Sequence, residues 1–365
     1  MKLFNNYKKI LIIGAGSGAD ILSSLLIVNE LKNKNNIIDL AGFLTPWAVH
    51  YFDNLIEKPI NIIKDGKNEK VKLGKTNISL PFFETTLHKL NKGNKLGVNK
   101  MFLFSLQKGT KVLKKNIEKI INKEGYDLIL VVDVGGDILV DKANLKDIFT
   151  PIVDISCLNI FSNIKTKAKK YLIVIAPGID GELKTKNLKL IIKKYEDNNK
   201  LIFTKKLSSL KSDYFLKASN SLNKVGFTNH TPKIIKKIIN NNLKNKEVYC
   251  KKSIFNNFQI TTKYEVLFNK YLVNNIFCFK LKDIFDNCPI KEDYSNLQEA
   301  FLLFKNKAVG GTEIDLSYIF DKNKKLVFIL NYNYLLSENQ KIKLKKEINN
   351  NLSNNIKIIS AIKKK

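Results

Sequence analysis

Short apolar runs alternate with amphipathic stretches over residues 1–197. The apolar runs carry hydrophobic residues on both faces, as the strands of a parallel sheet do. They cover residues 10–13, 37–44, 101–106, 126–133 and 171–175. The stretches between them include helical spacings over 20–31 and 110–122, and a helix start at Thr150-Pro151. Strands that alternate with helices predict a doubly wound, mostly parallel α/β sheet of the Rossmann-like class.

The regular alternation stops at a polar break, residues 196–200. Beyond it, helical spacings at 232–243 and 294–307 mix with strand candidates at 275–281 and 326–332, which indicates an α+β part. We therefore predict three units. They are a Rossmann-like core with ligand loops over 1–197, an α+β C-terminal part packed on it over 198–321, and a lysine- and asparagine-rich strand and tail over 322–365. Residues 340–365 have the pattern of a solvated amphipathic helix, with a weak membrane or nucleic-acid contact as the alternative.

The net charge of +30 changes this picture little. Lysine supplies all of the positive charge, because the chain contains no arginine. Proteins that read nucleic acids rely on the bidentate and stacking contacts of arginine, so we interpret the charge as a solvated lysine-rich surface and expect no nucleic-acid partner. The lack of arginine also limits chemistry, since only lysine, backbone N–H groups or a metal can hold a phosphate or carboxylate.

The expected location of the protein follows from features that its sequence does not show. No apolar window has the length of a membrane span, and the first apolar run ends in glycines without a cleavage site. The cysteines at 157, 250, 278 and 288 form no C-x-x-C pair. We expect a cytoplasmic protein without a membrane span; the pattern leaves its oligomeric state open.

The first candidate site is the glycine-rich turn between the first strand and the first helix. Gly14, Gly16 and Gly18, with Ala19, satisfy the G-x-G-x-x-G/A pattern, and Ser17 lies inside the turn. Such a turn exposes backbone N–H groups and the positive end of a helix dipole, which suits an anion. The alternative is a tight turn that needs glycine for conformational reasons alone.

Two details argue against a bare dinucleotide site at this turn. A ribose-binding acid is expected at the end of the second strand, whereas Asp39 lies early in that strand. Asp20 places a carboxylate in the first helical turn, where it would repel a pyrophosphate unless a cation intervenes. Simple complementation of the helix dipole is the other interpretation of Asp20.

Two further strand ends carry acids next to glycines. Asp133 and Asp137 flank Gly135 and Gly136 after the fourth apolar run. Pro177, Gly178 and Gly181 shape the loop after the fifth, which carries Asp180 and Glu182. Parallel strands present their carboxyl ends at one edge of a sheet, so the three loops are expected to share one crevice.

The acids suggest a division of roles. Carboxylates at the end of a buried strand are costly unless they bind something, so we predict that Asp133 and Asp137 bind a metal, with Mg²⁺ as the expected ion. We predict Asp180 and Glu182 as the catalytic pair that binds substrate hydroxyls or acts as base. The glycines, Ser17, Asp20 and Pro177 would bind the ligand. The alternatives are that Asp133 caps backbone amides and that Glu182 complements a helix dipole.

These residues point to a metal-dependent hydrolase or transferase that acts on a small phosphorylated or nucleotide-like metabolite. Because no nucleophile–base pair is visible, a non-catalytic ligand-binding or regulatory protein that uses the same crevice stays open. An enzyme with an adenosine cofactor, NAD or S-adenosylmethionine, is the third possibility. Which nucleotide or dinucleotide would bind is left open by the sequence.

In combination, the motifs resemble a known family. The residues concerned are Gly14–Asp20, Val132–Asp137, Thr150–Asp154, Ala176–Leu183 and, late in the chain, Gly311–Asp315, with a tryptophan loop at Thr45-Pro46-Trp47. Together they are similar to the prokaryotic family called domain of unknown function 1152, over residues 9–316. The resemblance implies an α/β fold and a shared ligand site, and it implies that Thr312, Glu313 and Asp315 return to that site. It supplies no activity.

Overall fold

The protein is described here from a computed structural model. The described residues are 1–16, 18–43, 60–62, 69–73, 76–80, 83–106, 108–148, 151–224, 230–255, 258–306, 316–320, 326–330 and 357–360.

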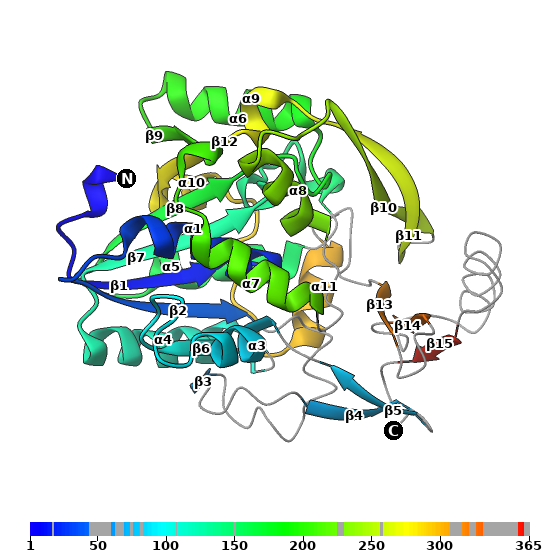
Figure 1. Ribbon diagram of the computed structural model, residues 1–365, viewed down its shortest axis with the longest axis horizontal. Coiled ribbons are helices and arrows are strands. Elements are labelled where there is room, and N and C mark those ends of the chain that lie inside the picture. Colours follow the sequence, from blue (N-terminus) through cyan, green and yellow to red (C-terminus); the bar gives the residue numbers. More distant parts are fainter. Residues whose placement is uncertain are drawn as a thin grey trace.

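An eight-stranded sheet forms the centre of the molecule, in the order β3-β6-β2-β1-β7-β8-β12-β9 (Figure 1). The five strands from β6 to β8 in this order are mutually parallel. β3 and β12 pair antiparallel with their inner neighbours, and β9 pairs antiparallel with β12. The strands are β1 (Lys9–Gly14), β2 (Ile37–Phe43), β3 (Ile60–Ile62), β6 (Met101–Phe104), β7 (Leu128–Val134), β8 (Lys169–Ile175), β9 (Leu201–Lys206) and β12 (Asn275–Lys280). This mostly parallel sheet confirms the predicted Rossmann-like class.

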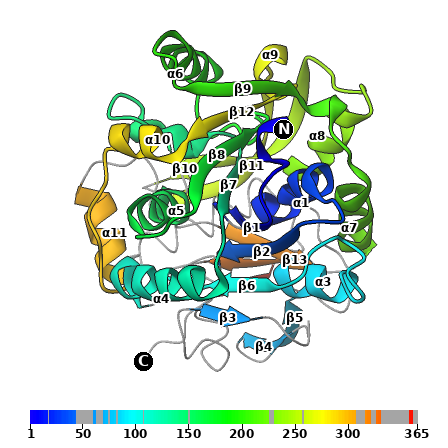
Figure 2. The ribbon, with the colours of Figure 1, turned by 90° about the vertical axis from the view of Figure 1, so that its left-hand side faces the viewer.

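Helices cover both faces of the sheet, and Figure 2 looks along the layers. On one face α1 packs against β1 and against α3, α7 and α8. On the other face α5 packs against β7 and against α4, α10 and α11. The helices are α1 (Ala19–Leu31), α3 (Phe83–Leu90), α4 (Gly109–Glu124), α5 (Pro151–Asn163), α6 (Thr185–Asp197), α7 (Asp213–Lys224), α8 (His230–Ile239), α9 (Lys270–Val273), α10 (Leu281–Asn287) and α11 (Leu297–Asn306). Short 3-10 turns lie at Lys2–Phe4, Asp137–Leu139, Leu145–Asp147 and Leu207–Ser209.

The two central helices are buried on all sides, which follows from their composition. α1 and α5 carry apolar or small residues on nearly every face, and residues 151–161 of α5 are all buried. α4 and α6 instead have one apolar stripe and a lysine-rich outer face. A helix that is apolar all round belongs inside a protein, whereas a striped one lies at its surface. Asp20 at the start of α1 and Asp154 in α5 are therefore buried in the centre of the fold.

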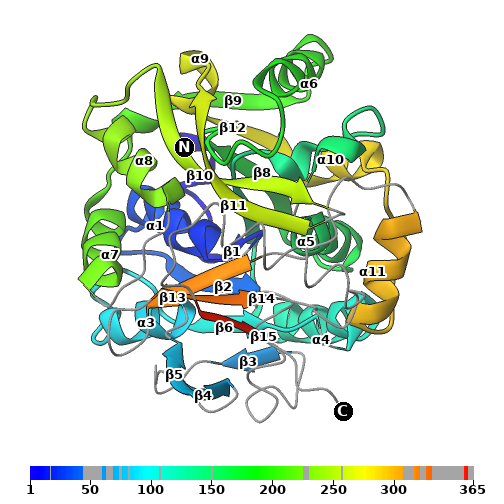
Figure 3. The same cartoon turned by 90° about the vertical axis from the view of Figure 1, so that its right-hand side faces the viewer.

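Smaller β elements lie outside the main sheet. They are the hairpins β4 (Glu69–Leu73) with β5 (Thr76–Leu80) and β10 (Lys246–Phe255) with β11 (Phe258–Leu267), and the sheet of β13 (Leu316–Phe320), β14 (Leu326–Leu330) and β15 (Lys357–Ser360). Figures 1 and 3 show the β10–β11 hairpin and the β13–β15 sheet on the side toward which the parallel strands point. That side carries the candidate site.

Two features of the C-terminal half bear on the expected organisation. β9 and β12 join the main sheet, so the sheet continues past residue 197. The last described segment, 357–360, forms a strand parallel to β14, so the expected helix over 340–365 is wrong for these residues. Their sequence, Lys-Ile-Ile-Ser, includes the β-branched residues that favour strands. Within the described part of the chain, no helix is both long and apolar enough to cross a membrane.

Candidate functional site

The site lies where the order of the parallel strands reverses. The chain runs outward from β1 to β2 and β6 and then returns to β7 on the other side of β1. Gly14 at the end of β1 is level with Val132 of β7, and Val134 is level with Ile175 of β8. The loops after these three strands therefore meet at one edge of the sheet. In doubly wound sheets this switch point is where ligands bind.

Asp20, on the first turn of α1, joins the first two loops. One carboxylate oxygen, Oδ2, accepts a hydrogen bond from Gly16 N at 2.5 Å, and Oδ1 accepts one from Val134 N at 3.0 Å. The side chain is buried. The amide that was expected to hold a ligand anion thus donates to the protein's own carboxylate. Asp20 occupies the position that a phosphate takes in a phosphate-binding turn.

Gly16 lacks a side chain where two carboxylates converge. A Cβ at this position would lie 2.5 Å from Asp20 Oδ2 and 3.0 Å from Asp154 Oδ1. Real Cβ atoms do not approach oxygen that closely, so a larger residue would displace both acids. The second glycine of the motif makes room for acids rather than for a pyrophosphate.

Asp133, the last residue but one of β7, lies at the centre of the cluster and is fully buried. Its Oδ2 accepts a hydrogen bond from Gly136 N at 2.9 Å. This bond is the backbone cap that the sequence left open as an alternative. Its Oδ1 is also buried but has no hydrogen-bond partner among the described residues. Buried polar atoms are almost always paired, so an oxygen left over in this way indicates a bonding partner that the described residues do not supply.

Asp20, Asp133 and Asp154 together form a group that can hold a metal ion. Each offers one carboxylate oxygen, and these oxygens all lie within 4.8 Å of one another. We call these residues the aspartate triad. Oxygen donors from several carboxylates suit a hard divalent cation such as Mg²⁺, Mn²⁺ or Ca²⁺.

The other predicted acids line the same edge. Asp137 begins the 3-10 turn after β7 and is buried, as is Glu182, while Asp180 is half-buried. A Cβ on Gly135 would overlap the Asp180 carboxylate, so the third loop packs directly on the second. Asp180 Oδ1 also accepts a hydrogen bond from Glu182 N at 3.0 Å. Gly178 N donates to the Gly135 carbonyl at 2.6 Å, which fixes the two loops together.

The acids repel one another electrostatically. Burial raises the pKa of Asp20 to about 8, and the negative charges of Asp180 and Glu182 add to the rise. Burial likewise raises the pKa of Asp133 well above its usual range, helped by Asp137 and Asp20. The pKa of Asp137 is raised for the same reason, with Asp154 and Glu182 as its strongest neighbours. The three loops thus gather acids whose ionisation is unfavourable without a counter-charge, in a chain whose net charge is +30.

Asp154 reaches the triad from the opposite layer, on α5. The sequence indicated it only as an acid in a first helical turn, and it was not among the predicted ligands. The missed signal was the apolar character of the whole helix, because an acid on a helix buried on all sides must have a buried partner or ligand.

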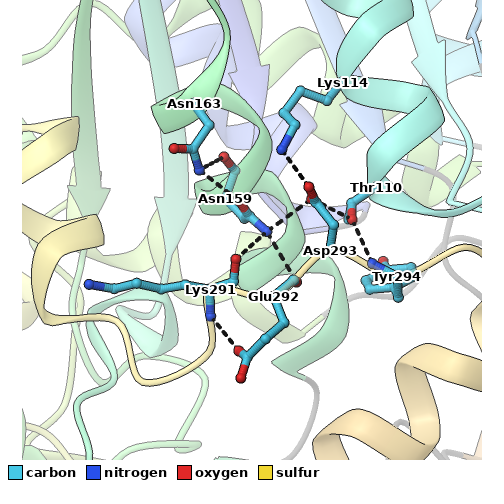
Figure 4. A network of polar contacts seen from close by, with 8 residues as sticks. All are labelled: Thr110, Lys114, Asn159, Asn163, Lys291, Glu292, Asp293 and Tyr294. Carbon is cyan, nitrogen blue, oxygen red and sulfur yellow. Dashed lines mark hydrogen bonds and ion pairs between the residues drawn. The ribbon is translucent and has the colours of Figure 1, made fainter.

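A polar network holds the far end of α5 (Figure 4). Asn159 Nδ2 donates to the backbone carbonyls of Lys291 and Glu292 at 3.3 and 3.2 Å. Asp293 accepts from Thr110 Oγ1 at 2.9 Å and forms an ion pair with Lys114 at 2.6 Å. Segment 291–294 thereby ties α5 to the start of α4 and restricts the helix that carries Asp154.

The structure brings most of the predicted site residues together. The three loops converge with their glycines, Pro177 and the five predicted acids at one edge of the sheet. Asp154, rather than Asp137, completes the triad with Asp20 and Asp133. Asp39 points elsewhere, because its partners Asn99 and Lys100 precede β6 at the opposite edge. Several predicted residues lie outside the described residues, namely Ser17, Thr45, Pro46, Trp47, Thr312, Glu313 and Asp315.

The fold and the site define a doubly wound α/β protein with a cluster of acids at its switch point. The chain matches the family model described as "Protein of unknown function (DUF1152)" over residues 11–224, which include β1 to α7 and all three loops. The protein therefore belongs to this family, as its motifs suggested. No curated protein matches the chain.

Proposed function

We propose that the protein is a divalent-cation-dependent enzyme that acts on a small phosphorylated or nucleotide-like metabolite at the switch-point crevice. The observation that carries the proposal is the unpartnered, fully buried Oδ1 of Asp133 within the aspartate triad. Burying several like charges is unfavourable unless a counter-charge binds among them. A divalent cation supplies that charge and bonds the free oxygen.

The cation also explains how an arginine-free chain would hold an anionic substrate. Gly16 N donates to Asp20 and is not available to a phosphate. The phosphate would instead bind to the metal held by Asp20, Asp133 and Asp154, with Mg²⁺ as the expected ion. A bound divalent cation neutralises phosphoryl charge and lowers the pKa of a coordinated water.

Asp180 and Glu182 are the candidates for contact with the substrate. They lie on the third loop, which packs on the second through Gly135. Asp180 is the more exposed of the two, so it can meet a ligand that enters from solvent. Glu182 is buried and carries the backbone N–H that orients Asp180. We assign Glu182 as the candidate general base and Asp180 as a substrate-binding residue.

Titration calorimetry with Mg²⁺ and Mn²⁺ tests the metal site. We expect the wild type to bind one ion per chain and Asp133→Asn to bind at least about tenfold more weakly, a loss of about 1.4 kcal/mol. Asp293→Asn is the matched control, because Asp293 forms its ion pair with Lys114 outside the triad. Equal affinity in Asp133→Asn and wild type would refute the metal assignment.

Turnover separates an enzyme from a ligand-binding protein. The Mn²⁺-loaded protein is incubated with a pool of phosphorylated metabolites, and products are followed by mass spectrometry. We expect at least one phosphorylated compound to be consumed by the wild type but not by Glu182→Gln. A compound that binds tightly and is never converted would instead favour the regulatory alternative.

A further inference from the structure

The outer face of α6 is positively charged and has no acids to balance it. Four exposed lysines follow one another along this face, Lys186, Lys189, Lys193 and Lys194. Within the described part of the chain, no ion pair joins any of these four to an acid. The acids of the helix, Glu196 and Asp197, lie together at its C-terminal end. The face over 186–194 is therefore open to an anionic partner.

An exposed leucine lies among these lysines. Leu190 is 60% exposed, although α6 already buries a complete apolar stripe made of Leu188, Ile191, Ile192 and Tyr195. The packing of the helix therefore does not account for Leu190. A single exposed leucine is ordinary on a protein surface, so its meaning depends on whether other apolar side chains lie near it.

Two more exposed apolar side chains lie next to the start of α6. Leu267, the last residue of β11, is 72% exposed, and Tyr271 of α9 is 50% exposed. The Thr185 hydroxyl donates to the Leu267 carbonyl at 3.5 Å, which places the end of β11 against the first residue of α6. Figures 1, 2 and 3 show α6 and α9 at the same end of the molecule, next to the edge strand β9. Among the described residues, Leu267 and Leu190 are the two most exposed large apolar side chains.

Lysines surround this second group as well. Lys246 is in register with Leu267 in the hairpin, Lys244 lies just before β10, and Lys270 begins α9; all three are exposed. We call these lysines, those of α6 and the three exposed apolar residues the α6–α9 surface. Exposed apolar side chains set among lysines are typical of proteins that bind the surface of an anionic membrane, where lysines contact headgroups and apolar side chains enter the interface. Tyrosine also favours that interface, because one end of its side chain is apolar and the other polar.

We propose that the α6–α9 surface docks the protein on a lipid bilayer that contains anionic headgroups. Nucleic acid is a poorer fit, because phosphates make no use of exposed leucines and the chain has no arginine for base or stacking contacts. A second copy of the chain is also a poorer fit, since it would bring lysines against lysines. None of these residues belongs to the three loops of the candidate site, so docking does not depend on the metal.

Vesicle flotation with the full chain tests the docking. The vesicles consist of phosphatidylcholine alone or of phosphatidylcholine with about 30% phosphatidylglycerol, and a chelator is present so that divalent ions cannot bridge protein and lipid. We expect the apparent affinity for the anionic vesicles to be at least about fivefold higher at about 0.1 M salt, and to fall steeply toward about 0.5 M as the charges are screened. Equal binding to the two compositions, or binding to neither, would overturn the proposal.

A matched pair of lysine variants locates the surface. Lys189→Gln combined with Lys193→Gln is expected to lower the affinity for anionic vesicles at least about fivefold, because both charges lie on the docking face. Lys115→Gln combined with Lys119→Gln is the control. These two lysines are also exposed and four residues apart on a helix, α4, so the net charge changes equally. The control should stay within about twofold of the wild type. Equal losses in the two variants would mean that the net charge acts without a defined surface, and would refute the proposal.

The apolar side chains distinguish a bilayer from a nucleic acid. We expect Leu190→Asn combined with Leu267→Asn to lower vesicle affinity at least about threefold, because the bilayer interface takes up apolar surface. Leu302→Asn on α11 is the control, since Leu302 is 54% exposed and lies outside the α6–α9 surface. If the lysine pair matters and the leucine pair does not, and if a DNA duplex binds more tightly than the vesicles, the surface is a nucleic-acid site and the proposal is wrong.

Docking and the proposed function can fail independently. Asp133→Asn should remove metal binding and leave vesicle binding unchanged, whereas the lysine and leucine pairs should leave the Mg²⁺ Kd within about twofold. A urea unfolding curve for each variant verifies that it is folded.

Discussion

Two fully buried aspartates at opposite edges of the same sheet differ in one respect. Asp39 on β2 and Asp133 on β7 are both inaccessible to solvent. Asp39 accepts hydrogen bonds from Asn99 Nδ2 at 2.8 Å, Lys100 N at 2.9 Å and the Tyr126 hydroxyl at 2.5 Å. Asp133 Oδ2 accepts one from Gly136 N, and its Oδ1 has no partner among the described residues. Burial alone therefore does not distinguish the two acids; the bonding of their oxygens does.

The surroundings reinforce the contrast. The amino edge near Asp39 mixes both signs of charge, with Glu124 paired to Lys9 and Lys100 at 2.9 and 2.7 Å. The carboxyl edge near Asp133 gathers acids from three loops and α5. The charges of the first arrangement are paired within the chain, whereas Asp133 Oδ1 in the second has no partner among the described residues. A structural role for Asp39 and a binding role for Asp133 predict opposite responses to mutation and to metal.

The largest expected effect is the loss of stability when Asp39 is truncated. Asp39→Ala removes the acceptor of three hydrogen bonds and leaves the buried Tyr126 hydroxyl without a partner. We expect the free energy of unfolding to fall by about 3 kcal/mol. Asp133→Asn in the metal-free protein should change it by less than about 1 kcal/mol, because burial already disfavours the ionised form of Asp133 and asparagine keeps an acceptor for Gly136 N. Urea unfolding of both variants measures the difference, and equal losses would abolish the comparison.

The effect of pH is the next largest and has the sign set by Asp20. Its pKa is raised from 3.8 to about 8, so between these values the folded state keeps a proton that the unfolded state has released. The metal-free protein should therefore lose stability as pH rises from 4 to 8, by up to about 1.4 kcal/mol per pH unit for each retained proton. Saturating Mn²⁺ displaces the proton and should flatten the dependence.

Urea unfolding at pH 5, 6.5 and 8, with chelator or with Mn²⁺, measures this dependence. Other groups titrate over the same range, so the quantity to compare is the difference between wild type and Asp20→Asn at each pH. If the wild type instead gains stability relative to Asp20→Asn as the pH rises over this range, the chain itself already neutralises these acids and the predicted sign is wrong.

Much of the fold was predictable because the strands are apolar on both faces. β1, β2, β7 and β8 were placed by runs of isoleucine, leucine and valine, which only a sheet covered on both sides can bury. The β10–β11 hairpin was not predicted, since residues 246–267 have no such apolar run and few turn signals. Its pairing depends on partner strands rather than on a local pattern.

The sequence predicted which loops form the site, but not which residues bond to one another within it. Topology alone brings the ends of β1, β7 and β8 together, so the acids near them could be grouped in advance. The use of Gly16 N by Asp20, and the arrival of Asp154 from α5, depend on three-dimensional packing that spacing does not encode. The same holds for Thr110 in the first turn of α4, whose hydroxyl bonds to Asp293 and Tyr294 from a distant part of the chain.

The smallest expected effect concerns a third acid, Asp293, which is partly exposed and fully engaged by the chain. It accepts from Thr110 and pairs with Lys114 at the far end of α5. Asp293→Ala should lower the free energy of unfolding by about 1 kcal/mol, as expected for a partly screened pair with one added hydrogen bond. Because Asp154 lies at the other end of α5, the Kd for Mn²⁺ should stay within about threefold. A larger loss of Mn²⁺ affinity would mean that the polar network around Asp293 is energetically coupled to the triad. The structural and the binding acids of this protein would then not be independent.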